Sequence, residues 1–170
     1  MMERILVIGC PGAGKTTLAR QMSEKLNLPL IHLDSLFWLT GWKEREREEF
    51  DRLLGEALEK PKWIIDGNYG RTLPLRLQYC DTVVFLDFPT GVCLWGVICR
   101  VVTNWGRVRP DMGAGCPERL DWEFLRYVRD FNKTNREKLL SKIAAADPSV
   151  KVITLKSRRE VRKFCNEIIL

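Results

Sequence analysis

The sequence predicts an α/β fold of three layers, in which helices cover both faces of a five-stranded parallel sheet. The first reason is that short apolar runs alternate with helical patterns along the 170 residues, which is typical of a parallel sheet. The second is that these apolar runs are nearly continuous, as strands buried on both faces require. With 45% hydrophobic and 29% charged residues, residues 1–170 are expected to form one domain with a substantial core.

The strongest motif lies at the first turn of the chain. An apolar run at residues 5–8 leads into Gly9-Cys10-Pro11-Gly12-Ala13-Gly14-Lys15-Thr16, which fits G-x-x-x-x-G-K-[ST] at every fixed position. A helical pattern follows over residues 15–26. Strand, glycine loop and helix in this order are typical of a phosphate-binding loop. A tight turn without a ligand would not need a lysine and a threonine at those two positions.

Glycines in such a loop adopt backbone angles closed to other residues and leave no Cβ in the way of an anion. Successive N–H groups then line a concave anion site at a helix N-terminus, where the helix carries partial positive charge. Lys15 is placed to reach the β- and γ-phosphates of a nucleotide, and the Thr16 hydroxyl is placed to bind Mg²⁺. The expected nucleotide-binding residues are Gly9, Gly12, Ala13, Gly14, Lys15, Thr16 and Thr17, with Arg100 against the donor phosphates.

The remaining elements continue the alternation. Four further strands are expected at residues 29–33, 62–65, 82–86 and 150–155. Helical patterns cover residues 43–60, 90–102, 117–146 and 158–170, with Thr90 as an N-cap and a break near residues 132–135. Residues 35–42 are expected to be irregular, and the stretch at residues 103–118, which contains glycines and a proline, is expected to form a short mobile lid.

Three of the expected strands end in an aspartate: Asp34, Asp66 and Asp87. Ligands of open α/β sheets bind outside the carboxyl ends of the strands, so Asp34 and Asp66 are expected to face the phosphate loop as catalytic residues. One carboxylate would orient the waters of Mg²⁺, with Asp66 and Thr16 as the metal residues, and the other would take a proton from an acceptor hydroxyl. The alternative for both is a helix-cap or turn aspartate. Asp87 is expected to be a structural turn residue.

Arginines supply the positive charge that phosphoryl transfer needs. Arg107 and Arg109 lie in the lid and, together with Lys15, are expected to be catalytic by stabilising charge in the transfer. Acceptor binding is assigned to Asp34 and Trp38 and to five arginines, namely Arg71, Arg76, Arg126, Arg129 and Arg136. Arg126, Arg129 and Arg136, with Lys133, would form one basic stripe on an unbroken helix. The alternative for the stripe is a solvated helix face.

Other features have plainer interpretations. His32 is more readily a packed or hydrogen-bonded residue than a catalytic one, and Trp38 either stacks on an aromatic ligand or packs in the core. Six scattered cysteines and a single histidine offer no zinc spacing and suit a reducing cytosol. With no signal peptide or bilayer-length apolar run evident, a cytoplasmic protein without a membrane partner is expected. The net charge of +6 suits an anionic partner of unspecified kind.

The motifs resemble those of the adenylate-kinase-like small-molecule kinases. The shared features are the N-terminal phosphate loop, Asp66-Gly67 after the third strand, Leu86-Asp87-Phe88-Pro89 after the fourth and an arginine-bearing lid. Longer blocks are similar to the bacterial DNA topology modulation (FlaR-related) proteins. These blocks are residues 32–38, 63–69, 109–112, 115–118 and 120–124.

The resemblance implies a P-loop kinase-like fold with strand order 2-3-1-4-5, and ATP with Mg²⁺ as ligands. It leaves the acceptor open. Adenylate kinases carry a longer acceptor segment that opens with Thr-Gly, whereas Asp34-Ser35-Leu36-Phe37-Trp38 occupies that place here, at the start of an acceptor side expected over residues 34–62. Asp34 instead resembles the arrangement in kinases that phosphorylate hydroxyls, such as shikimate and gluconate kinases.

Two functions are therefore expected. The first is transfer of the γ-phosphoryl group of ATP to a small molecule, with a nucleotide or nucleoside slightly ahead of a sugar or hydroxy acid. The alternative is a nucleic-acid-binding ATPase or regulator that affects DNA topology. The resemblance and the basic stripe favour this alternative, but no helix-turn-helix, zinc-finger or RNA-binding signature is visible.

Overall fold

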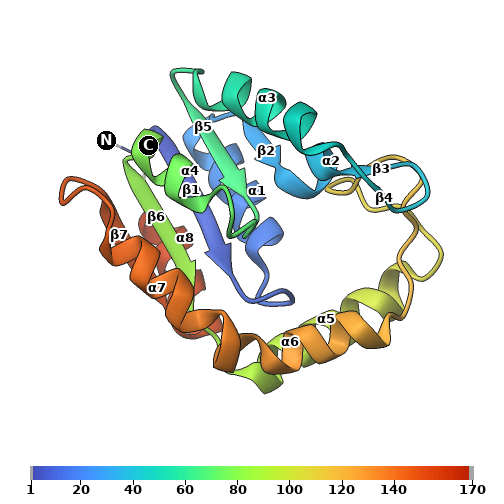
Figure 1. The fold of residues 1–170 in the computed structure, drawn as a ribbon. Helices are drawn as coiled ribbons and strands as arrows, with labels where there is room; N and C mark the ends of the chain where they lie inside the picture. The colour runs from blue at the N-terminus through green and yellow to red at the C-terminus, as the bar shows by residue number, and fades with distance from the viewer. Residues whose placement is uncertain (1, 169–170) are drawn as a thin grey trace.

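The computed structural model describes residues 2–168. The strands are β1 (Arg4–Gly9), β2 (Leu30–His32), β3 (Trp38–Leu39), β4 (Lys43–Glu44), β5 (Trp63–Asp66), β6 (Thr82–Leu86) and β7 (Lys151–Leu155). The helices are α1 (Lys15–Leu26), α2 (Leu33–Phe37), α3 (Arg47–Leu58), α4 (Leu73–Tyr79), α5 (Thr90–Asn104), α6 (Trp122–Thr134), α7 (Arg136–Ala144) and α8 (Arg158–Glu167). Figure 1 shows their arrangement.

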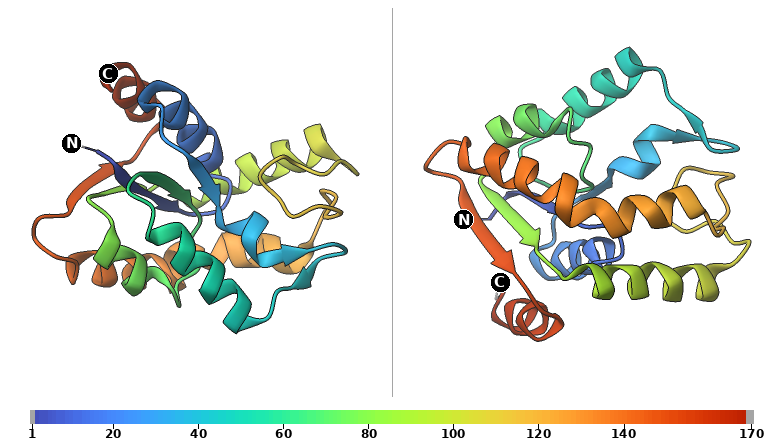
Figure 2. Two further views of the ribbon diagram at one scale, coloured as in Figure 1. Left: turned by 90° about the horizontal axis from the view of Figure 1, so that it is seen from above. Right: turned by 60° about the horizontal axis from the view of Figure 1, so that its bottom comes forward.

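The main sheet has five parallel strands in the order β2-β5-β1-β6-β7. Because β5, β6 and β7 are the third, fourth and fifth strands of this sheet along the chain, the predicted order 2-3-1-4-5 is confirmed. Figure 2 shows the three layers, with α1 and α8 on one face of the sheet and α3, α4 and α7 on the other. The predicted three-layer fold is therefore confirmed as well.

The core lies around the central strands. Every residue of β6, and every residue of β1 after Arg4, is buried, because helices cover both faces of the sheet at these positions. Helices α5 and α6 pack against each other and extend beyond the strands, and the lid between them returns toward the β3–β4 hairpin (Figure 1). The hairpin and lid are joined where the Gly41 N–H donates to the Gly115 carbonyl at 3.1 Å.

The acceptor side differs from the sequence prediction. Strand β2 ends at His32, and Asp34 lies in the first turn of α2 rather than after a strand. Residues 35–42, expected to be irregular, contain the rest of α2 and the first strand of a hairpin. The helix expected from Lys43 begins only at Arg47, because Lys43 pairs with Leu39 across the hairpin. The helical pattern of the charged residues 43–46 is therefore overridden by pairing within a local hairpin.

The long helix expected over residues 117–146 begins only at Trp122, where the Asp121 side chain accepts from the N–H groups of Glu123 and Phe124. Its predicted break is confirmed at Asn135, between α6 and α7. Thr90 is the first helical residue of α5 rather than its N-cap. The last helix is described as far as Glu167, and residues 169–170 of its predicted span lie outside the described residues. No helix within residues 2–168 has the length and apolar character needed to cross a membrane.

Candidate active site

The phosphate loop between β1 and α1 has a backbone that only glycine fits. Gly12 and Gly14 have φ values of 81° and 94°, in the left-handed region that residues with a Cβ rarely adopt. A Cβ on Gly12 would overlap the Cys93 carbonyl oxygen, and one on Gly14 would overlap the Arg158 guanidinium. The loop therefore curls tightly at the N-terminus of α1, which is the arrangement that binds anions through backbone N–H groups.

Two of the expected loop contacts have other partners in this structure. The N–H of Ala13 donates to the Cys10 carbonyl at 3.1 Å, so it closes the turn of the loop. The Lys15 ammonium donates to the same carbonyl at 3.2 Å. Lys15 thus lies along the loop that it is expected to serve, where its charge is available to an anion seated on the N–H groups.

Thr16 and Asp66 form the centre of the site. Asp66 ends β5, beside Val7 of β1 and His32 of β2. Its Oδ2 accepts from the Thr16 hydroxyl at 2.7 Å, and His32 Nδ1 lies 3.2 Å from the same oxygen. The expectation that His32 is a hydrogen-bonded residue is confirmed by this contact.

The other oxygen of Asp66 is an orphan. Asp66 is 6% exposed, and its Oδ1 is buried without a hydrogen-bond partner within residues 2–168. A buried carboxylate oxygen without a partner is costly unless a cation compensates it. Mg²⁺ is bound through one or two carboxylates together with substrate phosphates and waters, and Thr16 with Asp66 fits this need. The described residues contain no cluster of three or more His, Cys, Asp or Glu side chains suited to a metal.

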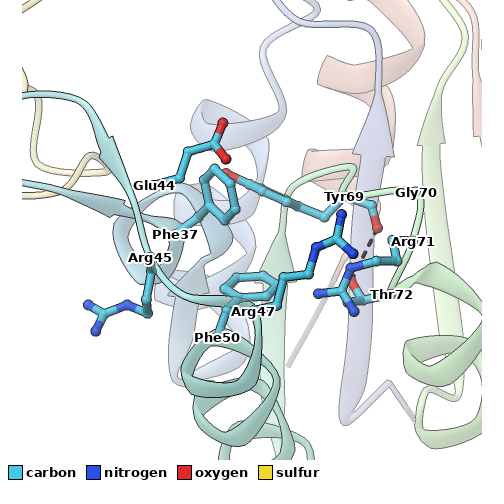
Figure 3. Close-up of a pocket in the computed structure, with 9 residues that line it drawn as sticks. All are labelled: Phe37, Glu44, Arg45, Arg47, Phe50, Tyr69, Gly70, Arg71 and Thr72. Atoms are coloured by element: carbon cyan, nitrogen blue, oxygen red, sulfur yellow. Dashed lines mark hydrogen bonds between the residues drawn. The ribbon is translucent and has the colours of Figure 1, made fainter.

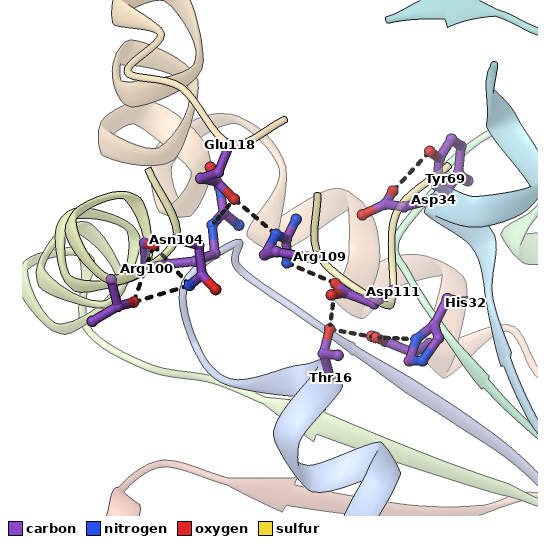
Figure 4. A network of polar contacts seen from close by, with 11 residues as sticks. Thr16, His32, Asp34, Tyr69, Arg100, Asn104, Arg109, Asp111 and Glu118 are labelled. Carbon is purple, nitrogen blue, oxygen red and sulfur yellow. Dashed lines mark hydrogen bonds and ion pairs between the residues drawn. The ribbon is translucent and has the colours of Figure 1, made fainter. Parts of the chain in front are cut away.

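Asp34 is positioned by α2 and by Tyr69. The Tyr69 hydroxyl donates to Asp34 Oδ1 at 2.8 Å (Figure 4). Burial raises the pKa of the Asp34 carboxyl above its ordinary value, the Tyr69 hydrogen bond lowers it, and the charge of Asp66 raises it again. Asp34 is therefore a stronger base than an ordinary aspartate, held by a donor that fixes its orientation.

The lid carries a chain of ion pairs above the loop (Figure 4). Arg109 donates to Asp111 Oδ2 at 2.6 Å, and its Nε lies 2.7 Å from Glu118 Oε2. Arg100 reaches the same Glu118 carboxylate at 3.2 Å from α5. Arg100 is expected to lie against the donor phosphates, but in the structure its guanidinium pairs with Glu118 of the lid. Arg107 is exposed at the start of the lid.

Arg76 has a structural role, so the prediction that it binds the acceptor is wrong. Its side chain is 0% exposed and donates to the backbone carbonyls of Gly67, Asn68 and Tyr69. Burial lowers the pKa of this guanidinium, and its two terminal nitrogens bind the carbonyls of the turn after β5. Arg71 instead lies at the surface, where it pairs with Asp51 at 2.6 and 2.9 Å.

The basic stripe is not formed. The break at Asn135 separates Arg136 from the helix that carries Arg126 and Arg129. Arg136 pairs in bidentate fashion with Asp87, at 2.7 Å for both contacts, and Arg129 pairs with its neighbour Asp130. The structural role expected of Asp87 is thereby explained: it anchors α7 to the end of β6. The expectation of one continuous basic face failed because helical periodicity does not carry across a break.

A pocket of about 260 Å³ lies behind Tyr69 (Figure 3). Its apolar lining comes from aromatic rings and its rim carries three arginines; the lining residues are Phe37, Glu44, Arg45, Arg47, Phe50, Tyr69, Gly70, Arg71 and Thr72. Trp38 does not line it, and instead makes edge-to-face contacts with Phe37 and Trp42 at 5.0 and 5.5 Å. The packing interpretation of Trp38 thus has the structural support.

Sequence reasoning missed several residues of the site. Asn68 joins the phosphate loop to the turn after β5: its Oδ1 accepts from Gly9 N–H at 3.0 Å, and its Nδ2 donates to the Gly9 carbonyl at 2.8 Å. Arg158 donates to the Ala13 carbonyl at 2.9 Å and covers the Phe88 ring. Asp111 and Glu118 complete the lid network. Asn68 had a signal in the sequence, because it follows Asp66-Gly67 at the edge where ligands bind, and Asp111 and Glu118 lie in the lid blocks that carry the family resemblance.

The sequence resembles known proteins over part of its length. Residues 5–65 match the ATPase family associated with various cellular activities (AAA). An adenylate kinase of Thermotoga neapolitana is 29% identical over 89 residues, which cover 51% of this chain and 40% of that protein. A shikimate kinase of Azobacteroides pseudotrichonymphae is 45% identical over 60 residues, 35% of this chain and 32% of that protein. The matches therefore span less than half of each relative.

The fold comparison covers nearly the whole chain. The solved structure of a shikimate kinase from Acinetobacter baumannii, in complex with shikimate, superimposes with a TM-score of 0.62. The match covers 99% of this chain and 91% of that one, at 19% identity. The fold is therefore the three-layer α/β fold of P-loop kinases, as the sequence predicted.

Proposed function

We propose that this protein is a phosphotransferase that moves the γ-phosphoryl group of ATP to a hydroxyl of a small acceptor. One observation carries the proposal: the phosphate loop, the Thr16–Asp66 pair, Asp34 and the lid arginine Arg109 converge at one edge of the sheet (Figure 4). Each of the recurring requirements of phosphoryl transfer, namely a phosphate cradle, a metal site, a base and a mobile positive charge, has a candidate here.

Each residue of the site has a role that follows from its position. The loop N–H groups and Lys15 hold the phosphates of the donor, and Arg109 stabilises charge on the group in transfer. Asp34 accepts the proton of the attacking hydroxyl, with Tyr69 fixing its orientation. When bound, Mg²⁺ neutralises phosphate charge, and Thr16 and Asp66 would hold it.

The acceptor is proposed to be a small, anionic, hydroxylated molecule. Asp34 with a raised pKa suits proton abstraction from a hydroxyl. The pocket next to Tyr69 is lined by Arg45, Arg47 and Arg71, of which Arg45 pairs with Glu49 and Arg71 with Asp51. Arg47 is therefore the cation proposed to meet a carboxylate or phosphate of the acceptor. The similarity to a shikimate kinase, and to a structure with bound shikimate, is compatible with this class, whereas the similarity to an adenylate kinase is compatible with a nucleotide acceptor.

A nucleic-acid-binding regulator of DNA topology is not favoured. The basic stripe that would support it is interrupted at Asn135, and two of its arginines are engaged with Asp87 and Asp130. Exposed charge from Arg126 and Lys133 remains, which is an ordinary solvated helix face.

The test is ADP release by the purified protein with ATP and Mg²⁺ against a panel of hydroxy acids, sugars, nucleosides and nucleotides. Acceptor-dependent release from one anionic hydroxyl compound is expected. Lys15→Ala should abolish this release, and Lys60→Ala, at an exposed lysine of the surface, should leave it intact. Release that is independent of every acceptor, or unchanged in Lys15→Ala, would contradict the proposal.

A further inference from the structure

The lid places a second carboxylate at the Thr16 hydroxyl. Asp111 lies in the lid, 95 residues from Thr16 in the chain, yet its Oδ2 is 3.5 Å from Thr16 Oγ1 (Figure 4). Asp111 is 7% exposed, so solvent does little to screen its charge there. The lid thus reaches the same atom that the nucleotide-binding loop is expected to offer to a cation.

Two carboxylates compete for this hydroxyl. Thr16 has one proton to donate, and Asp66 Oδ2 accepts it at 2.7 Å. Asp111 is left at a longer contact, and Asp66 retains a buried oxygen without a hydrogen-bond partner within the described residues. Like charges brought together in a buried place are unfavourable unless a cation compensates them.

The arginines of the lid do not provide that compensation for Asp66. Arg109 pairs with Asp111 and with Glu118, and Arg100 pairs with Glu118. These two cations are therefore matched by the two acids of the lid, and the contacts of Asp66 are a hydroxyl and an imidazole. Within residues 2–168, the carboxylate without a cationic partner is therefore Asp66, and Asp111, which shares Arg109, approaches the same Thr16 hydroxyl.

We propose that Asp111 is a cation ligand carried by the lid. A hard divalent cation, Mg²⁺ or Mn²⁺, would be held by oxygen atoms of Thr16 and Asp66 on the sheet side and Asp111 on the lid side, so cation binding and lid closure are coupled. Oxygen ligands of this kind are those that Mg²⁺ and Mn²⁺ prefer. This inference rests on the proposed function in one respect, which is that both place a cation at Thr16 and Asp66. Its test measures cation binding and does not depend on catalytic turnover.

Closure of the lid can be measured through the contacts that the lid makes with the β3–β4 hairpin. The N–H of Gly41 in the hairpin donates to the Gly115 carbonyl, Cys116 Sγ lies 3.2 Å from the Leu39 carbonyl oxygen, and a Cβ on Gly113 would overlap the Trp38 carbonyl. The closed lid therefore holds the Gly41 amide of the hairpin in a hydrogen bond and packs against the hairpin backbone at Trp38 and Leu39. Opening of the lid exposes this amide to hydrogen exchange.

The experiment measures Mn²⁺ binding by electron paramagnetic resonance, with the protein free of nucleotide. The variants are Asp111→Asn, Asp66→Asn and the matched control Glu123→Gln, which neutralises an exposed acid of α6. Asp111→Asn and Asp66→Asn are each expected to weaken binding by about 10-fold or more, because even the loss of a group that only hydrogen-bonds to a metal ligand costs about 10- to 100-fold. The control should stay within about 2-fold of wild type on the same scale.

Hydrogen exchange supplies the second readout. Mg²⁺ or Mn²⁺ should slow exchange of the Gly41 amide, which donates to the lid at Gly115, in the wild-type protein and not in Asp111→Asn. Asp111→Glu keeps the carboxylate and is expected to restore cation-dependent protection, which separates ligation from a general folding defect. Thermal unfolding of each variant checks that it is folded.

Three results would overturn the proposal: no Mn²⁺ binding by the nucleotide-free wild type at millimolar concentration, unchanged affinity in Asp111→Asn, or exchange of the Gly41 amide that ignores the cation. Failure of the proposed function looks different. In that case no acceptor gives ADP release, while cation binding and protection of the Gly41 amide still depend on Asp111.

Discussion

The Tyr69 hydroxyl donates a hydrogen bond to Asp34 Oδ1 at 2.8 Å, while the Tyr69 ring lines the pocket proposed for the acceptor. One side chain therefore contacts both the proposed base and the proposed acceptor site. Tyr69 holds a positive φ of 31°, which is uncommon for a residue with a Cβ. The turn that holds it is stabilised by the donors of the buried Arg76.

Tyr69→Phe is expected to shift the acid limb of the pH profile of kcat/KM to higher pH. The hydrogen bond from Tyr69 stabilises the ionised carboxylate and lowers the pKa of Asp34, against the larger upward effect of burial. Its removal raises that pKa further, so a higher pH is needed to produce the basic form. The measurement is kcat/KM between pH 4 and pH 8. An acid limb that does not move would remove Asp34 from the role of base.

Asn68→Ala is expected to weaken both the fold and ATP binding. The variant removes two hydrogen bonds to the backbone of Gly9, and the loss should lower the free energy of unfolding by about 1–3 kcal/mol. ATP affinity should fall because the strand leading into the phosphate loop loses its support. Urea unfolding and nucleotide titration measure the two effects. Asn166→Ala, at an exposed position of α8, is the control and should change neither.

Arg109→Ala is expected to lower kcat on the order of 10²-fold, the scale seen when a donor to transition-state charge is removed. The dissociation constant of ATP should change by less than about 3-fold if Arg109 contacts the group in transfer rather than the bound ground state. Single-turnover kinetics and equilibrium nucleotide binding separate the two. Equal losses in both would assign Arg109 to ground-state binding of the donor.

Arg136→Ala is expected to affect stability and leave turnover intact. The pair with Asp87 anchors α7, but the Arg136 side chain is 38% exposed, so solvent screening limits its contribution to at most about 1 kcal/mol. Chemical unfolding should detect this small loss, while the KM for the acceptor stays unchanged. A large rise in the KM for the acceptor would instead indicate that Arg136 binds the acceptor.

The features that could be predicted from the sequence depend on neighbours in the chain. The phosphate loop needs glycines at positive φ immediately before Lys15 and Thr16, and this requirement is visible in eight consecutive residues. Asp66 could be placed at the ligand-binding edge because it directly follows a buried apolar run. The alternation of strands and helices likewise predicted the fold class, since each element's periodicity is local.

Errors arose where tertiary contacts competed with local patterns. Asp34 was placed after a strand, although it lies in a short helix that is packed against α3. Arg76 has the sequence pattern of a surface arginine, but its two terminal nitrogens donate to three carbonyls of a turn that only the packed fold brings around it. Its burial could not be inferred from the residues beside it.

The sequence by itself therefore determined the fold class, the phosphate loop and the aspartate at the end of the third sheet strand. The tertiary structure alone decided which distant groups meet them: Asn68 at Gly9 across 59 residues and Asp111 at Thr16 across 95. The physical reason is that a local backbone conformation is set by a few adjacent side chains. A contact between remote residues depends on how whole helices, strands and loops pack together. The sequence pattern of either segment alone does not reveal that packing.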